Sequence, residues 1–156
     1  MIVEAKKLTP DNVKPYGSMI SVSAFPPQKS RGPFTWHGTA GVIQVPSVSV
    51  NLCSMEKHDC VLDEMEYHTA TSEALIAIKG SGFIVALAPA GILQPEKIEA
   101  FYIPAGEGII FNYEIYHSTP FPTEGATDFI VIFAEGTGAN DLVKEKLGEP
   151  ITITKN

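Results

Sequence analysis

Short stretches of alternating or wholly apolar residues run along the chain and are separated by turns. In residues 47–55, Val48, Val50 and Leu52 alternate with polar residues, which is the two-residue period of a half-buried strand. Further runs typical of strands cover residues 16–20, 74–78, 83–88, 101–104, 108–111, 129–134 and 151–153. The 13 glycines and 12 prolines suit frequent turns, so the pattern predicts about nine short strands and little helix. We therefore expect an all-β fold, an antiparallel double-sheet β-barrel of the jelly-roll type.

Two segments carry more local predictions. Residues 60–68 are expected to be the antiparallel partner of residues 47–55, across a polar turn at residues 57–59. Residues 139–147 show a weak helical period, although glycines surround them.

Residues 25–39 form a loop rich in Pro, Gly, Ser and Lys, and this loop carries several side chains of interest. We expect Trp36 to be an aromatic residue of the core or of the barrel mouth. For His37, a structural or surface role and a substrate-facing role both stay open. Arg31 is the only arginine in the chain.

Composition sets the size and class of the fold. The 156 residues, 44% hydrophobic and 19% charged, suit one compact domain over residues 1–156. Within it we expect an N-terminal strand and loop over residues 1–40 and the barrel over residues 41–156.

The charge and the apolar segments exclude several kinds of partner. A net charge of −7 repels phosphate backbones, so nucleic acid is not an expected partner. No run approaches eighteen apolar residues and residues 1–4 do not begin a signal peptide, so we expect a soluble, cytoplasmic protein that binds no membrane. In that reducing compartment Cys53 and Cys60 should be free thiols, although a cross-strand bridge is the alternative.

Four side chains that could bind a metal lie on or next to the predicted strands. Glu66 and His68 are two residues apart and point the same way in a strand, while Glu73 lies near the start of the next apolar run and His117 follows residues 108–111. Two carboxylates and two imidazoles suit a divalent metal such as Mn, Fe, Ni or Zn. The alternative is that the glutamates are rim carboxylates of an empty barrel and that His117 is only hydrogen-bonded.

The spacing of these residues resembles the two-part signature of the cupin barrels. Its first part is matched by His68, Glu73 and Gly80, with Glu66 in place of a histidine and Cys60 in place of a glycine. Its second part is matched by Gly106 and His117, while Asn112, Glu114 and Phe121 replace its Pro, Gly and Asn. The resemblance implies a cupin-type barrel with a metal inside.

Longer segments resemble one family of cupins, the ureidoglycolate lyases. Residues 66–75 are similar to its Glu-Arg-His-Pro-x-x-Ser-Gln-Ala-Phe, with Tyr67 in place of arginine and Glu73 in place of glutamine. Further similar segments are residues 15–17, 36–37, 83–89, 100–101, 106–108, 112–117, 128–132 and 149–153. The resemblance thus spans nearly the whole chain.

The family resemblance implies a function in purine (allantoin) breakdown, the elimination of urea from ureidoglycolate to leave glyoxylate. His68, Glu73 and His117 would hold the metal, with Glu66 as a fourth ligand or as the base. Glu66, Tyr116 or His37 would protonate the leaving nitrogen. The side chains expected to contact the hydroxy-acid or ureido substrate are Tyr67, Ser72, Arg31, Asn112 and Tyr113.

Other functions stay open for a cupin with these residues. One is a small-ligand-binding cupin without catalysis, which would carry no metal. Another is a related metal-dependent enzyme, an isomerase or dioxygenase, with a different substrate. In each case we expect a homodimer that covers exposed sheet edges, with the N-terminal strands as one candidate for the contact.

Overall fold

The computed structural model describes residues 1–155, and in this range the chain is mostly β with one four-residue helix, α1 (Thr137–Asn140). Two short 3₁₀ helices cover Val22–Ala24 and Pro95–Lys97. The strands are β1 (Ile2–Lys7), β2 (Gly17–Ile20), β3 (Lys29–Arg31), β4 (Phe34–Trp36), β5 (Val48–Met55), β6 (Val61–Tyr67), β7 (Glu73–Gly80), β8 (Phe83–Ala88), β9 (Glu99–Ile103), β10 (Gly108–Phe111), β11 (Tyr116–His117), β12 (Phe121–Pro122), β13 (Thr127–Ala134) and β14 (Val143–Thr154). The predicted all-β barrel with little helix is confirmed, with more strands than expected.

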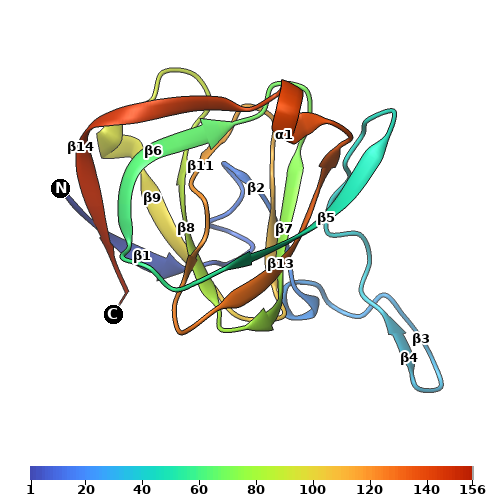
Figure 1. Ribbon diagram of the computed structural model, residues 1–156. Coiled ribbons are helices and arrows are strands. Elements are labelled where there is room, and N and C mark those ends of the chain that lie inside the picture. The colour runs from blue at the N-terminus through green and yellow to red at the C-terminus, as the bar shows by residue number, and fades with distance from the viewer. Residues whose placement is uncertain (156) are drawn as a thin grey trace.

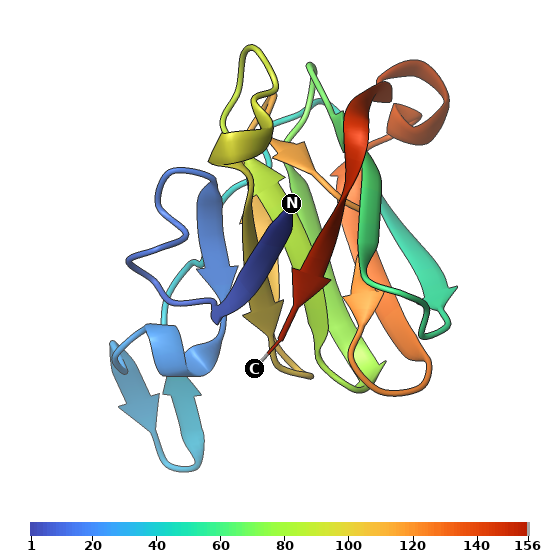
Figure 2. The same ribbon diagram turned by 90° about the vertical axis from the view of Figure 1, so that its left-hand side faces the viewer.

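Two sheets build the barrel (Figures 1 and 2). The larger sheet has the order β11-β6-β14-β1-β9-β8-β12, and β11 also pairs with β8, which closes this sheet on itself. The second sheet has the order β2-β10-β7-β13-β5. Strands β1 and β2 therefore belong to these sheets, although they lie in the segment 1–40 that the sequence analysis set apart from the barrel.

The pairing is antiparallel except at β1. This strand runs parallel to both β14 and β9, so the expectation of a wholly antiparallel barrel is wrong at this position. The first half of β1, residues 2–4, pairs with β14, and the second half, residues 5–7, pairs with β9.

Strand β5 pairs with a different partner from the one that sequence adjacency predicts. It forms an eight-residue antiparallel ladder with β13, whereas β6 pairs with β14 and β11 in the other sheet. The turn between β5 and β6 thus crosses from one sheet to the other, and the predicted hairpin is wrong.

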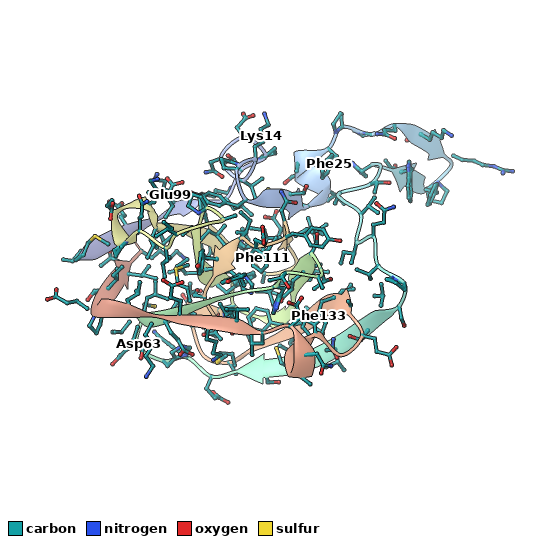
Figure 3. All side chains as sticks on the ribbon, turned by 90° about the horizontal axis from the view of Figure 1, so that it is seen from above. Lys14, Phe25, Asp63, Glu99, Phe111 and Phe133 are labelled. Atoms are coloured by element: carbon teal, nitrogen blue, oxygen red, sulfur yellow. The ribbon has the colours of Figure 1, made fainter. Side chains whose placement is uncertain are left out.

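Strand β8 is buried on both faces, which explains its unbroken apolar sequence. Phe83, Val85 and Leu87 enter one apolar cluster, which lies against β7, β10 and β13 of the second sheet. The alternate residues of β8 enter a second cluster with side chains of β6, β9 and β14. Figure 3 shows Phe111 of the first cluster within the barrel, whereas Lys14 and Asp63 lie at its outer surface.

Strands β3 and β4 form a hairpin that projects from the barrel (Figures 1 and 2). The sequence predicted only a loop here. Trp36 is 46% exposed on this hairpin, so its expected place in the core or at the barrel mouth is wrong.

The segment 139–147 is not helical as its weak period suggested. Helix α1 ends at Asn140, and β14 begins at Val143. Among residues 1–155, no helix is long and apolar enough to cross a membrane.

Gly80 ends β7 in a conformation that leaves no room for a side chain. Its φ is +96°, and a Cβ would lie 2.2 Å from the carbonyl oxygen of Ala126. We expect Gly80→Ala to lower the free energy of unfolding by about 3 kcal/mol, measured by urea denaturation. Gly91→Ala is the matched control, because φ is +107° there but nothing lies within 4 Å. Its expected cost is about 1 kcal/mol. Equal losses in the two variants would contradict the packing argument.

Candidate metal centre

Three neighbouring elements bring the predicted ligands together. Glu66 lies near the end of β6, His68 follows this strand directly, and Glu73 begins β7. His117 lies on β11, where it pairs in register with Glu66. The two halves of the sequence pattern, about fifty residues apart, therefore meet through a single strand pairing.

The ligand atoms of His68, Glu73 and His117 all lie within 4.8 Å of one another, and the three residues are buried. The Nε2 atom of His68 is 2.8 Å from Glu73 Oε2, and His117 Nε2 is 3.7 Å from the same oxygen. Glu66 lies at the margin of this group, with Oε1 at 3.8 Å from His117 Nε2. The geometry thus gives a buried group of three ligands with a fourth carboxylate beside it.

Backbone carbonyls orient both imidazoles for ligation. His68 Nδ1 lies 2.5 Å from the carbonyl oxygen of Asp141, and His117 Nδ1 lies 3.0 Å from that of Ile115. A carbonyl only accepts, so each Nδ1 carries the hydrogen, which is the usual outer partner of a metal-bound histidine. The His117 ring also stacks on Phe111, with ring centroids 4.5 Å apart. Both Nε2 atoms are thereby directed at the carboxylate of Glu73.

His117 Nε2 is buried and has no hydrogen-bond partner. A buried nitrogen lone pair without a partner is costly in a protein interior unless something binds it. Together with two carboxylates and a second imidazole, this atom fits a divalent metal with nitrogen and oxygen ligands. The buried group could bind such an ion.

The surroundings of His68 favour its protonated form when no metal competes. Burial alone lowers the pKa of His68, but hydrogen bonds to Glu73 and to the Asp141 carbonyl, with the charges of Glu73 and Glu66, raise it overall. When His68 is protonated in the metal-free protein, its Nε2 and Glu73 Oε2, 2.8 Å apart, form a buried ion pair.

This ion pair predicts a pH dependence of stability for the metal-free protein. Because the pKa of His68 is raised in the folded state, its stabilising contribution is complete below the unfolded pKa, about 6.5, and is lost as pH rises through the higher folded value. We expect the free energy of unfolding to fall as pH rises above about 6.5, with a smaller slope in Glu73→Gln. His58→Ala is the surface-histidine control and should keep the wild-type slope. An unchanged slope in Glu73→Gln would contradict the ion pair.

A cavity of about 360 Å³ opens onto the group, lined in part by Glu66, His68, Glu73 and His117. The rest of its wall is mostly apolar and includes Phe133, which Figure 3 labels. No lysine or arginine is among the lining residues. The cavity wall therefore holds two carboxylates and neither a lysine nor an arginine.

The other two residues predicted to be catalytic lie outside this cavity. The Tyr116 hydroxyl donates a hydrogen bond to Glu145 Oε2 at 2.7 Å, and the Tyr116 ring packs on Tyr67 with centroids 4.8 Å apart. Burial and the Glu145 carboxylate raise the pKa of Tyr116, so its hydroxyl holds its proton. His37 lies in a separate depression and contacts the carbonyl oxygen of Phe25.

The residues predicted to contact substrate also lie apart from the cavity wall. Arg31 is exposed on the projecting hairpin, and Tyr67 faces Tyr116. Asn112 is exposed, and the Tyr113 hydroxyl reaches the carbonyl oxygen of Gln44 at 3.3 Å. Ser72 is buried beside Glu73 but is not part of the lining.

Several polar residues that line the cavity were not predicted from the sequence. Asn51 and Cys53 enter it from β5, and Ser118 and Thr119 enter it just after β11. Asn51 donates its amide hydrogens to Ser49 Oγ and to the Val131 carbonyl, which leaves its side-chain oxygen as an acceptor. The alternation of residues 47–55 could have identified Asn51 and Cys53, because the polar side of that strand faces the cavity.

The amino-acid sequence is similar to a known protein family and to individual members of it. The profile of the family described as Ureidoglycolate lyase matches residues 1–154. The chain belongs to this family. It is 31% identical over 90 residues to a ureidoglycolate lyase of Burkholderia mallei, covering 58% of this chain and 52% of the relative. It is 30% identical over 93 residues to ureidoglycolate lyase 2 of Rhizobium meliloti, covering 58% of this chain and 57% of that one.

These alignments span about half the length of the curated ureidoglycolate lyases that the chain matches. Among solved structures, a Bacillus subtilis oxalate decarboxylase matches with a TM-score of 0.46 and 16% identity. That match covers 65% of this chain and 24% of the decarboxylase.

Proposed function

We propose that this chain is a metal-dependent ureidoglycolate lyase that cleaves ureidoglycolate into glyoxylate and urea. Family membership supports the substrate. The observation that carries the proposal is the unpartnered, buried His117 Nε2 facing Glu73 and His68 at the cavity. His68, Glu73 and His117 would hold one divalent ion, from among Mn, Ni, Zn and Fe, with Glu66 as a fourth ligand or as the base.

The charge of the cavity supports a role for the ion in binding substrate. Ureidoglycolate is an anion, and Glu66 and Glu73 repel it while no lysine or arginine lines the wall. A bound divalent cation supplies the missing positive charge and lowers the pKa of a hydroxyl group that it ligates. Tyr67 stands in place of the family's arginine and packs against Tyr116 away from the cavity. This position therefore supplies no positive charge to the substrate.

The reaction moves one proton within the substrate. The O–H bond breaks as the C=O bond of glyoxylate forms, the C–N bond breaks, and the urea nitrogen takes a proton. Glu66 is the carboxylate that lines the cavity without the close imidazole contact of Glu73, so we assign it the transfer of the proton from oxygen to nitrogen. The side-chain oxygen of Asn51 is placed to accept a hydrogen bond from a ureido N–H.

The proposal is tested by product analysis with metal-free and metal-loaded protein. We expect the loaded protein to release glyoxylate and urea in a one-to-one ratio and the chelator-treated protein to lose at least about 100-fold in rate. Binding of glyoxylate, measured by calorimetry, should also weaken strongly without metal, because Glu66 and Glu73 repel an anion and no lysine or arginine lines the cavity. Full activity after complete metal removal would contradict the proposal.

We also propose a reducing, cytoplasmic setting and a homodimer as the working unit. Cys53 and Cys60 are both free thiols, which supports the first proposal. Strand β5 ends its sheet, and an exposed edge strand favours pairing or covering by a second copy, which supports the second.

A further inference from the structure

Asp141 lies directly beside His68, although the two residues are 73 positions apart in the chain. Strand β14 brings them together, because its first residue, Val143, pairs with Tyr67 at the end of β6. Asp141 also ends helix α1, and its backbone N–H donates a hydrogen bond to the Thr137 carbonyl at 2.9 Å. The segment between α1 and β14 is thus held against the point where β6 ends (Figure 1).

The carboxylate of Asp141 binds the turn that follows His68. Its Oδ1 atom accepts hydrogen bonds from the backbone N–H of Thr69 at 2.8 Å and from the Thr69 hydroxyl at 2.7 Å. Its Oδ2 atom accepts one from the backbone N–H of Ala70 at 2.8 Å. Hydrogen bonds to an ionised carboxylate are stronger than those between neutral groups. Three of them fix the two residues after His68 relative to Asp141.

The backbone of the same residue contacts the imidazole of His68. The Asp141 carbonyl oxygen accepts the Nδ1 hydrogen, and the Nε2 atom on the other side of the ring lies 2.8 Å from Glu73 Oε2. The carboxylate of Asp141 therefore fixes the chain beside His68, and its carbonyl fixes the ring. If this carbonyl moved, the ring would turn and Nε2 would leave the other ligand atoms.

Other contacts fix the backbone of this turn but not the ring nitrogen. The His68 carbonyl accepts a hydrogen bond from the Glu114 N–H at 2.8 Å. Farther along the turn, the Thr71 hydroxyl accepts one from the Ala134 N–H at 3.0 Å. Neither contact reaches Nδ1 of His68, whose hydrogen bond goes to Asp141.

We propose that Asp141 is a positioning residue for the metal centre. Its carboxylate holds the turn after His68 in place, and its carbonyl thereby orients the His68 ring for ligation. Gly138 and Leu142, on either side of Asp141, line the cavity, so the same contacts also hold this part of the cavity wall. The inference rests on the proposed metal-dependent function, but the orientation of the ring is measurable without metal or substrate.

Asp141→Ala tests the proposal, because it removes the three hydrogen bonds of the carboxylate and keeps the backbone carbonyl. We expect the affinity for Mn²⁺, measured by calorimetry, to fall about 10- to 100-fold, as is usual when the outer support of a metal-bound histidine is lost. In the metal-free protein, the His68 ring Nδ1–H should exchange with water at least about tenfold faster, measured by ¹H–¹⁵N NMR. The backbone amides of β8 are the internal reference, since a general loss of stability would speed their exchange as well.

Asp128→Ala is the matched control. Asp128 is also half-buried, and its Oδ1 accepts a hydrogen bond from the Ser54 hydroxyl at 2.6 Å. This variant should keep both the Mn²⁺ affinity and the ring exchange of wild type. Thr69→Val removes only the hydroxyl contact with Asp141, so it should lower the affinity about threefold and speed the ring exchange by a similar factor. Thr69→Ser should restore both values.

Unchanged ring exchange in a folded Asp141→Ala protein overturns the positioning role, whatever the affinity of that variant for Mn²⁺. If Asp141→Ala does not fold, the Thr69 variants decide, and equal ring exchange in Thr69→Val and Thr69→Ser overturns the role. A wild-type protein that binds no divalent metal contradicts the proposed function instead. Faster ring exchange in Asp141→Ala would still show that Asp141 orients His68.

Discussion

Replacing His117 with alanine is expected to weaken binding of a divalent metal at least about 100-fold, because one of the ligands is removed. Its Nε2 is buried, has no protein partner and lies 3.7 Å from Glu73 Oε2. Ureidoglycolate cleavage should be lost with the metal. Calorimetric titration with Mn²⁺, Ni²⁺ and Zn²⁺ measures the effect on the purified variant.

The control for this variant is His58→Ala, which removes an exposed histidine whose Nδ1 contacts only the Glu56 carbonyl. It should keep both metal affinity and activity. Because His117 is buried against Phe111, His117→Gln is a second variant that fills more of the space. Wild-type metal affinity in a folded His117→Ala protein would contradict the ligand set.

Replacing Glu66 with glutamine is expected to lower kcat by about 10²–10⁴-fold while the metal stays bound. The amide keeps the shape of the side chain but cannot accept the substrate proton. His68, Glu73 and His117 remain in place, so metal affinity should change less than about tenfold. Steady-state kinetics on the metal-loaded variant separates kcat from KM.

Glu64→Gln is the matched control, because Glu64 lies two residues earlier on β6 and its carboxylate binds Lys144 at 2.6 Å. It should keep kcat within about threefold, as a surface ion pair contributes little. If Glu66→Gln also kept kcat, another group would carry the proton and our assignment of Glu66 would be wrong.

The two-residue period of a strand is enough to predict that Glu66 and His68 face the same site. It does not predict every residue that lines the cavity. Glu66 and His68 share one face of a strand and its extension, and that local rule holds in the structure. The same rule places Tyr67, which lies between them, on the opposite face, and Tyr116 opposite His117. Their rings accordingly pack on each other outside the cavity. Alternation thus already argued against Tyr67 and Tyr116 as site residues.

Long-range strand pairing could not be predicted from the sequence. Residues 47–55 and 60–68 look like a hairpin because they are adjacent and joined by a polar turn, yet β5 pairs with β13, some eighty residues away. Which strands pair depends on side-chain contacts between distant segments, and neither segment shows its partner in its own sequence. The parallel pairs of β1 are equally non-local.

The aliphatic residues of β5 gave a misleading signal for the same reason. Val48, Val50 and Leu52 suggest the buried side of a half-buried strand, but the structure turns them outward and directs Asn51 and Cys53 inward. A polar inner side occurs where a cavity replaces packed core.

The most direct measurement is anomalous X-ray diffraction from crystals of the tag-free protein loaded with Mn²⁺. We expect one strong peak per chain at about 2.0–2.3 Å from His68 Nε2, His117 Nε2 and a carboxylate oxygen of Glu73. Loaded crystals without a peak there, or with the peak at other residues, would contradict the metal centre and with it the proposed lyase mechanism.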